Sequence, residues 1–206
     1  LVAVNVGNTR TRLGDIHEAG IANAASFGSD DVAAIVGQVA KWWSEAKEPR
    51  AIVMASVNDP AADRLAATLT DQLGAPVYRI GEDVPIPIDV RLDPETITGV
   101  DRLLNAVAAF ETLEQACVVI DAGTAITVDF VDGVGTFHGG AIAPGAALQL
   151  RCLAEHTRAL PEVEFGAPDG EPFGRSTAEA MRRGVYYGLR GLVWRLVEQY
   201  AEAYGA

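Results

Sequence analysis

The first 80 residues alternate between short apolar runs and longer segments whose apolar residues recur at helical spacing. The apolar runs are separated by turns that contain glycine, which is typical of β-strands, and we expect strands at 1–6, 11–17, 20–27, 51–57 and 75–80. Helical periodicity covers residues 30–47, after an acidic start, and 60–74, which ends at Gly74. Mixed strands and helices of this kind predict an α/β protein.

The rest of the chain repeats that order of strands and helices. Residues 81–99 contain three prolines and several acids, which is typical of an irregular connection and, at this length, of a functional one. We expect three strands with glycine turns within 116–145. Helical periodicity predicts helices at 101–115, 146–160 and 176–205.

The repeat extends to individual residues. When VAVNVGNTRT is placed over VVIDAGTAIT, which begins at Val118, Asn5 aligns with Asp121 and Gly7 aligns with Gly123. Strand–glycine–turn sequences are common, so chance similarity is the alternative. A true repeat predicts a duplicated α/β fold with two mixed-sheet halves around a cleft. The halves would be residues 1–100 and 101–206, with the helix at 101–115 on the boundary.

Each half has a strand–turn–strand corner suited to a phosphate group. Gly7 and Gly123 allow a tight backbone turn and a close approach to the ligand, while Thr9 and Thr124 add hydroxyl donors. The alternative is a pair of ordinary hairpin turns. Neither corner is a Walker loop, because no Gly-Lys-Ser/Thr sequence follows.

Two predicted helix starts carry further candidates. In GVDRLLNA, Asp101 could act as the general base for a substrate hydroxyl and Arg102 could bind a substrate carboxylate. The alternative is that Asp101 only stabilises the N-terminus of its helix. Ser176 with Glu179 forms a capping-box pattern, and Thr177 could hold a ligand through its hydroxyl.

The charge and the hydropathy of the chain limit the partners that we expect, and its cysteines indicate the compartment. The net charge is −12, whereas nucleic acid is bound through clustered Lys and Arg, so we expect no nucleic-acid partner. No apolar stretch approaches the roughly 20 residues of a membrane span, so we expect no membrane partner. Cys117 and Cys152 lie far apart in the sequence and are expected to be buried free thiols, which favours the cytoplasm.

These pieces, in this order, resemble the type III pantothenate kinases, which are Bvg accessory factor-like relatives of the actin, sugar kinase and Hsp70 ATPase fold. The resemblance covers almost the whole chain and is carried by VGNT, ASV, GVDR, DAGTAITVD, GGAIAPG, the LP at 160 and GRSTAEAMRRGVYYG. It implies an ATP-dependent phosphorylation of pantothenate to 4'-phosphopantothenate, the first step of coenzyme A synthesis. Mg²⁺ and a monovalent cation, K⁺ or NH₄⁺, are implied as cofactors, and the resemblance also implies a homodimer.

The resemblance also implies roles for residues at matching positions. Asp101 would be the catalytic proton acceptor, and Asp121 would bind the monovalent cation. The first phosphate loop would consist of Asn5, Val6, Gly7, Asn8, Thr9, Arg10, Thr11 and Arg12. ATP would also contact Gly123 and Thr124. The contacts to pantothenate would come from Gly99, Val100, Asp101, Arg102 and Thr177.

The chain departs from the family pattern in three places. Asn5 stands where the family has an Asp that helps to hold Mg²⁺, and an amide oxygen is a poorer ligand because Mg²⁺ prefers charged oxygen ligands and dehydrates reluctantly. The sequence stops at EAYGA, where family members usually continue into another strand, so a truncated C-terminus is expected. Arg91 lies where the family often has Tyr.

Two hypotheses of different classes follow from these observations. The first is a type III pantothenate kinase weakened by Asn5. The second is a catalytically inactive, pantothenate kinase-like binding or regulatory protein. The combination of Asp101, Arg102, Asp121 and Thr124 favours the kinase, since a scaffold has no evident need for all four, whereas Asn5 favours the second hypothesis.

Overall fold

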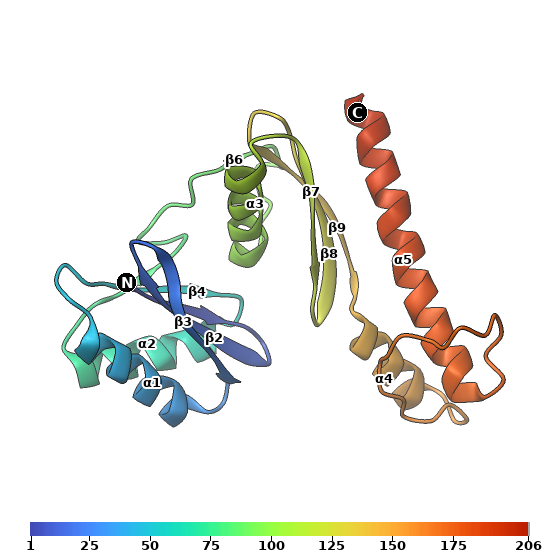
Figure 1. The fold of residues 1–206 in the computed structure, drawn as a ribbon, viewed down its shortest axis with the longest axis horizontal. Coiled ribbons are helices and arrows are strands. Elements are labelled where there is room, and N and C mark those ends of the chain that lie inside the picture. Colours follow the sequence, from blue (N-terminus) through green and yellow to red (C-terminus); the bar gives the residue numbers. More distant parts are fainter. Residues whose placement is uncertain (206) are drawn as a thin grey trace. The chain divides into compact units, whose positions relative to one another are not determined.

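The computed structural model describes residues 1–205 and divides them into two compact units. Of these residues, the first unit contains 1–87 and 97–104, and the second contains 88–96 and 105–205. Figure 1 shows the order of the elements along the chain. The expected boundary between residues 100 and 101 falls at the start of helix α3 (Val100–Leu113), and the assignment of the two halves stays a prediction.

The first unit is built on a five-stranded mixed sheet with the order β3-β2-β1-β4-β5. Its strands are β1 (Val2–Val6), β2 (Arg10–His17), β3 (Gly20–Gly28), β4 (Ile52–Ser56) and β5 (Val77–Arg79). The first three strands form an antiparallel meander, while β4 pairs parallel with β1 and β5 pairs parallel with β4. β1 therefore lies at the centre of the sheet.

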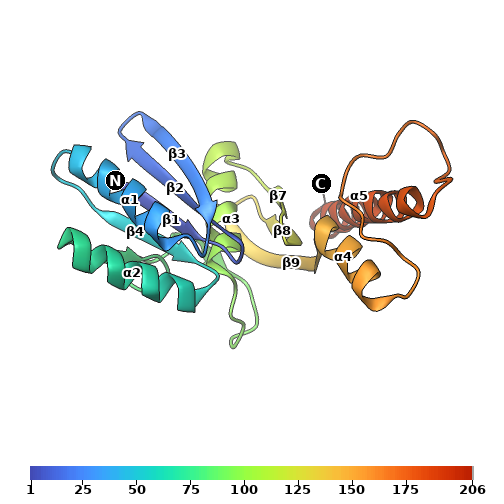
Figure 2. The same cartoon turned by 90° about the horizontal axis from the view of Figure 1, so that it is seen from below.

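Helices α1 (Val32–Glu45) and α2 (Asp59–Leu73) cover one face of this sheet, as Figure 2 shows. Alternate residues of β1 are buried, and Val2, Val4 and Val6 pack into one core with the apolar faces of both helices. Each helix starts at a side-chain cap, because Asp31 accepts a hydrogen bond from the N–H of Ala34 and Asn58 accepts one from the N–H of Ala61. Successive side chains of a strand point to opposite faces of the sheet, so Asn5, between Val4 and Val6, points to the face of the sheet opposite the core and is exposed.

The second unit contains a four-stranded mixed sheet with the order β6-β9-β8-β7. Its strands are β6 (Asp89–Val90), β7 (Cys117–Ala122), β8 (Ala125–Val131) and β9 (Thr136–Pro144). β7, β8 and β9 form an antiparallel meander, and β6 pairs parallel with β9. Helices α4 (Ala146–His156) and α5 (Thr177–Tyr204) lie side by side in Figures 1 and 2 and share a small core around Leu150, Met181 and Val185.

The two meanders confirm the predicted fold class, a mixed α/β protein with two mixed sheets. β1 and β7, the strands aligned by the sequence repeat, occupy the same position in their meanders. Three expectations about smaller features were wrong. The connection at 81–99 contains the short strand β6, and α4 ends at His156 instead of residue 160. Cys152 is exposed and Cys117 is half-buried, so they are not a pair of buried thiols.

Candidate functional site

The first corner, between β1 and β2, is a tight turn that leaves its polar residues exposed. The N–H of Gly7 donates to the carbonyl of Arg10 at 3.1 Å, and a Cβ at Gly7 would lie 2.8 Å from that same oxygen. Glycine is therefore required by the close approach of the backbone. Asn8 and Thr9 are exposed at the tip, where a ligand can reach them.

Ser29, which follows β3, fixes the base of this corner. The Ser29 hydroxyl donates to the carbonyl of Gly7 at 2.9 Å, and the hydroxyl of Thr11 donates to Ser29 Oγ at 3.2 Å. Thr11 and Val6 are both buried, so their side chains support the turn from within the sheet. The two arginines of the predicted loop, Arg10 and Arg12, are exposed, and Arg10 Nε donates to Ser26 Oγ at 3.0 Å.

Asn5 lies one residue before the end of β1, on the exposed face. Its backbone pairs with Arg12 on β2 and with Ala55 on β4. The centre of a sheet fixes the direction of this side chain more firmly than a loop would. Asn5 brings a neutral amide to this position, next to the exposed Arg12.

The second corner, between β7 and β8, is held by the start of α4. The N–H of Gly123 donates to the carbonyl of Ala125, and the N–H of Gly145 donates to the carbonyl of Thr124, both at 2.9 Å. A Cβ at Gly145 would lie 2.7 Å from Thr124 O and closer still to Gly123 O. The GGAIAPG motif therefore ends in a glycine because a helix N-terminus packs directly on the corner.

Asp121, the residue aligned with Asn5, lies on the exposed end of β7. Asn105 on α3 donates from Nδ2 to Asp121 Oδ2 at 3.2 Å, which orients the carboxylate. Within residues 1–205, no group of three or more His, Cys, Asp or Glu side chains is close enough to hold a metal ion. A single carboxylate suits a monovalent cation that takes its other oxygens from carbonyls or water, and it is too few ligands for a protein-only Mg²⁺ site.

The GVDR segment forms the first turn of α3. The carboxylate of Asp101 accepts a hydrogen bond from the N–H of Arg102 at 2.8 Å, and that N–H also donates to the carbonyl of Gly99 at 3.1 Å. The helix start thus holds Asp101 in place, as the structural interpretation of the motif predicted. Asp101 is half-buried and keeps access to solvent, so the same position remains open to a catalytic role.

Thr177 is the first residue of α5, and its side chain is exposed. The capping box predicted at this helix is confirmed, since Ser176 Oγ accepts from the N–H of Glu179 at 3.2 Å. The predicted site residues are divided between the units: those from Asn5 to Arg12 and from Gly99 to Arg102 lie in the first. The second unit holds Asp121, Gly123, Thr124 and Thr177.

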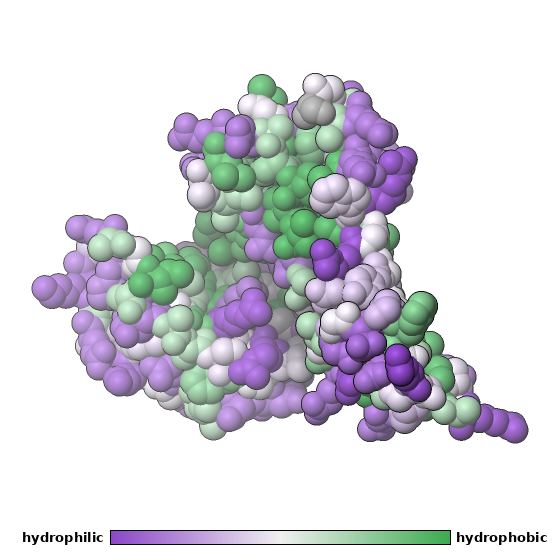
Figure 3. Space-filling model, turned by 45° about the vertical axis from the view of Figure 1, so that its right-hand side comes forward, coloured by the Kyte–Doolittle hydropathy of each residue, from purple (hydrophilic) through white to green (hydrophobic). Residues whose placement is uncertain are grey.

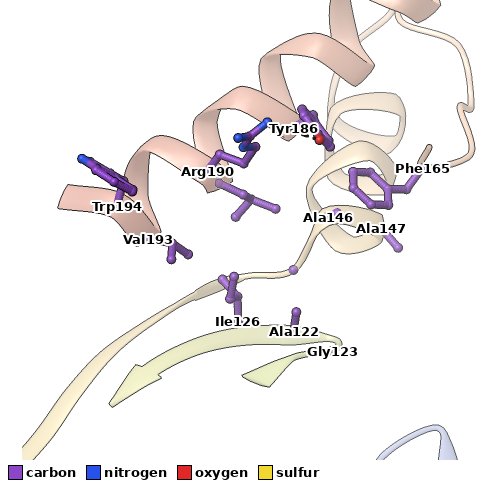
Figure 4. A pocket seen from close by; sticks show the side chains of 12 residues that line it. Ala122, Gly123, Ile126, Ala146, Ala147, Phe165, Tyr186, Arg190, Val193 and Trp194 are labelled. Carbon is purple, nitrogen blue, oxygen red and sulfur yellow. Dashed lines mark hydrogen bonds between the residues drawn. The ribbon is translucent and has the colours of Figure 1, made fainter. Parts of the chain in front are cut away.

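A pocket of about 510 Å³ in the second unit begins at the second corner. Figure 4 shows α5 side chains on one side of it and Ala122, Gly123 and Ile126 on the other. Most of its walls are apolar, and the ring of Trp194 and the guanidinium of Arg190 line the α5 side. Figure 3 shows hydrophobic residues gathered on the upper part of that view of the surface. A pocket of this kind accepts a flat, partly apolar group.

The comparisons with known proteins decide the family. Residues 1–199 match the family model for type III pantothenate kinase. The chain belongs to this family. A type III pantothenate kinase from Dehalococcoides mccartyi strain 195 is 32% identical over 206 residues, covering 97% of this chain and 80% of the relative. The corresponding protein from Rhodopirellula baltica is 42% identical over 159 residues, covering 73% of this chain and 57% of that protein.

Two solved structures have the same fold as this type III pantothenate kinase family member. One is a Campylobacter jejuni protein of the Baf family of transcriptional activators, with a TM-score of 0.61 and 22% identity, covering 95% of this chain and 79% of that one. The other is a Sinorhizobium meliloti protein assigned as a 2-dehydro-3-deoxygalactonokinase, with a TM-score of 0.54 and 14% identity. It covers 92% of this chain and 79% of that one. At these identities both show the fold alone.

Family membership supports pantothenate kinase activity, with pantothenate and ATP as the substrates. In addition, across residues 1–205, no helix is both long and apolar enough to cross a lipid bilayer.

Sequence reasoning missed two features of this type III pantothenate kinase family member. One is the pocket beside Gly123, although Tyr186, Arg190 and Trp194 follow one another at intervals of four along α5 and so share a face. The other is a cluster formed by Asp132, His138 and Tyr204. These residues come from a hairpin turn, a strand and the last turn of a helix, so their meeting leaves no periodic signal.

In this cluster the carboxylate of Asp132 is fixed by three donors. His138 Nε2 lies 2.8 Å from one oxygen, and the N–H groups of Val134 and Thr136 donate to the other at 3.0 and 2.9 Å. The hydrogen bond from His138 is the main cause that lowers the pKa of Asp132 to about 2. Tyr204 Oη lies 2.6 Å from His138 Nδ1, which ties the end of α5 to the sheet.

Proposed function

We propose that this protein transfers the γ-phosphoryl group of ATP to pantothenate, forming 4'-phosphopantothenate and ADP, and that Asn5 lowers the rate. The family match over residues 1–199 is the observation that carries the proposal. The pair of glycine corners at equivalent positions of two meanders supports it, because the exposed side chains of Asn8, Thr9 and Thr124 offer donors to phosphate oxygens at both corners.

The roles proposed for the side chains follow from their chemistry. Asp101 accepts the proton of the attacking pantothenate hydroxyl as that oxygen bonds to the γ-phosphorus and ADP leaves. Arg102 and Thr177 bind pantothenate, with the guanidinium on its carboxylate. The exposed donors of the Gly7 corner, together with Gly123 and Thr124, bind the phosphates.

The metal ions are assigned by the charge of the available ligands. When Mg²⁺ is bound, it would neutralise the negative charge that develops on the transferred phosphoryl group. At the end of β1, Asn5 offers that ion an uncharged oxygen. If the poorer ligand costs a factor of about 10²–10³ in rate, the barrier rises by about 2.7–4 kcal/mol. Asp121, oriented by Asn105, is the proposed carboxylate ligand of K⁺ or NH₄⁺.

We place the nucleoside of ATP in the pocket that begins at Gly123. The pocket has room for a base and a sugar, and the indole of Trp194 offers a surface for stacking. A nucleoside there would continue directly from phosphates bound at the corner. On the strength of the family resemblance, we further propose a cytoplasmic location and a homodimer, and sedimentation of the purified chain would test the homodimer.

The test of the proposed activity is phosphorylation of pantothenate with ATP, Mg²⁺ and K⁺, comparing the chain with its Asn5→Asp variant. We expect weak turnover for the chain and a gain in kcat for the variant of about 10²–10³, the factor taken above as the cost of the poorer ligand. Asn8→Asp is the matched control, because it adds the same charge at the same corner, away from the end of β1. An equal gain in both variants would show a general charge effect instead of a missing metal ligand.

The alternative is a noncatalytic protein of the same fold that binds ligands or regulates other proteins. Asn5 is the observation that favours it, because it replaces a charged metal ligand by a neutral amide. If the chain and Asn5→Asp are both folded and bind ADP yet transfer no phosphate, the kinase proposal fails and the alternative stands.

A further inference from the structure

Arg183, in the second turn of α5, is a buried cation whose donors are only partly paired. Its side chain is 8% exposed. Nη2 donates to the backbone carbonyl of Asp169 at 3.3 Å and to the carboxylate of the same residue. Nε and Nη1 are buried as well, and within residues 1–205 neither has a hydrogen-bond partner. A guanidinium carries five N–H donors, and three of them are on these two nitrogens.

Buried donors without an acceptor destabilise a fold, and in native proteins nearly all of them are paired, with the chain, with ordered water or with a bound ion. Asp169 does not satisfy the group alone, because its contacts reach one nitrogen of the three. The missing partner must accept hydrogen bonds and must tolerate a positive charge. An anionic oxygen meets both requirements.

A cavity of about 210 Å³ lies next to this guanidinium. Its walls are the segment 167–169 on one side and a face of α5 on the other, formed by Glu179, Arg182 and Arg183. Those three residues are spaced by three and four positions, so they share one face of the helix. The cavity is therefore built by a single unit of the protein and needs nothing from elsewhere in the chain.

The cavity is lined by two guanidinium groups and two carboxylates, and the unpaired donors beside it belong to Arg183. Arg182 is fixed at the wall by a hydrogen bond from Nε to the carbonyl of Glu164 at 3.0 Å. Both acids at the cavity are already engaged, Asp169 by Arg183 and Glu179 by the N–H of Arg175 at 3.2 Å. The cavity also lies in the first turns of α5, where the helix dipole is positive.

We infer that this cavity binds a small oxyanion, the carboxylate or phosphate group of a ligand, through Arg183 and Arg182. The site is separate from the pantothenate contact proposed at Thr177. Six residues of an α-helix turn through about 600°, so Thr177 and Arg183 lie on different faces of α5. The inference does not depend on the proposed kinase activity, and a noncatalytic protein of this fold would have the same site.

The direct test is a titration of the whole chain with sodium sulfate and, separately, with sodium acetate, at constant ionic strength. Arg183 Nε–H is followed in a ¹H–¹⁵N spectrum of the arginine side chains. We expect one protected Nε–H signal, absent from Arg183→Lys, to shift in a saturable way with one of the two salts. Sulfate stands for a tetrahedral phosphate-like group and acetate for a carboxylate, so the salt that binds identifies the ligand class.

Matched variants separate this site from the predicted phosphate corners. Arg183→Gln should weaken binding at least tenfold, measured by the anion-dependent rise in Tm. Arg175→Gln removes the same charge from an arginine that is 81% exposed on the neighbouring loop, and it should bind as the parent does. Anions bound at the Gly7 and Gly123 corners raise the Tm of the parent and of both glutamine variants equally, so they do not affect the comparison.

Three outcomes would overturn the inference. The Arg183 signal could fail to respond to either salt, Arg183→Gln could retain the affinity of the parent, or both glutamine variants could lose affinity equally. If Arg183→Gln does not fold, Arg183→Lys keeps the charge and loses the guanidinium donors. That variant should then bind the anion more weakly than the parent.

Discussion

Gly145→Ala should disrupt the second phosphate corner with little damage elsewhere. Gly145 is the cap residue of α4, and its N–H donates to Thr124 O at 2.9 Å. The added Cβ would lie 2.7 Å from Thr124 O and still closer to Gly123 O, where ordinary van der Waals contact begins at 3.4 Å. Both contacts are with backbone, so no side chain can rotate away, and α4 and the corner must separate.

The size of the effect follows from that geometry. Restoring ordinary contact requires a shift on the order of 1 Å, and displacements of that size in a catalytic constellation cost about 10²-fold in rate. Overpacking in a tight contact costs about 1–3 kcal/mol of stability. We therefore expect kcat/KM for pantothenate phosphorylation to fall by about two orders of magnitude, while the chain stays folded at 25 °C.

The assay compares kcat/KM and ADP affinity for the Asn5→Asp protein with and without Gly145→Ala. Gly184→Ala is the control, because a Cβ there meets nothing within 4 Å and alanine favours a helix. It should leave both values unchanged. A Gly145→Ala protein with undiminished kcat/KM and ADP affinity would refute the argument that α4 shapes a phosphate-binding corner.

Two further predictions concern the second unit. The folded pKa of Asp132, about 2, is below its ordinary value of 3.8, so its contribution to stability is present above about pH 4 and is lost as the pH falls through about 2. Between about pH 5 and pH 2, urea denaturation should show that the free energy of unfolding falls by about 2 kcal/mol more for the parent than for Asp132→Asn. Equal falls would contradict the lowered pKa of Asp132. Trp194→Ala should weaken ATP binding about fivefold or more by removing a stacking surface, with no change for inorganic tripolyphosphate. Calorimetry with both ligands checks this, and a parallel loss for both would place the nucleoside elsewhere.

The features that could be predicted from the sequence are those encoded by neighbouring residues. The alternation at Val2, Val4 and Val6 predicts a strand with one buried face, and Ser176 with Glu179 predicts the start of α5, since both patterns are local. The short strand β6 has only two residues and gains its place by pairing with β9. No periodicity can be detected over so short a segment.

The site features that escaped prediction depend on contacts between distant residues. Tyr204 and His138 are 66 residues apart, and they meet because α5 packs along the sheet. The unpaired donors of Arg183 arise from the path of the loop that carries Asp169, which contains no regular pattern. By contrast, the turns at Gly7 and Gly123 could be predicted from the sequence, because the two segments align with each other and each supports the interpretation of the other.

The position of β7 has a consequence for handling the protein. β7 pairs with β8 on one side, and no strand among residues 1–205 pairs with its other side, whereas β1 has β4 at the equivalent edge. Ile120, in the middle of β7, is 47% exposed. An uncovered edge with apolar residues is a template for another extended chain. The purified chain should therefore associate edge to edge as its concentration rises, and a lysine at position 120 should keep it dispersed.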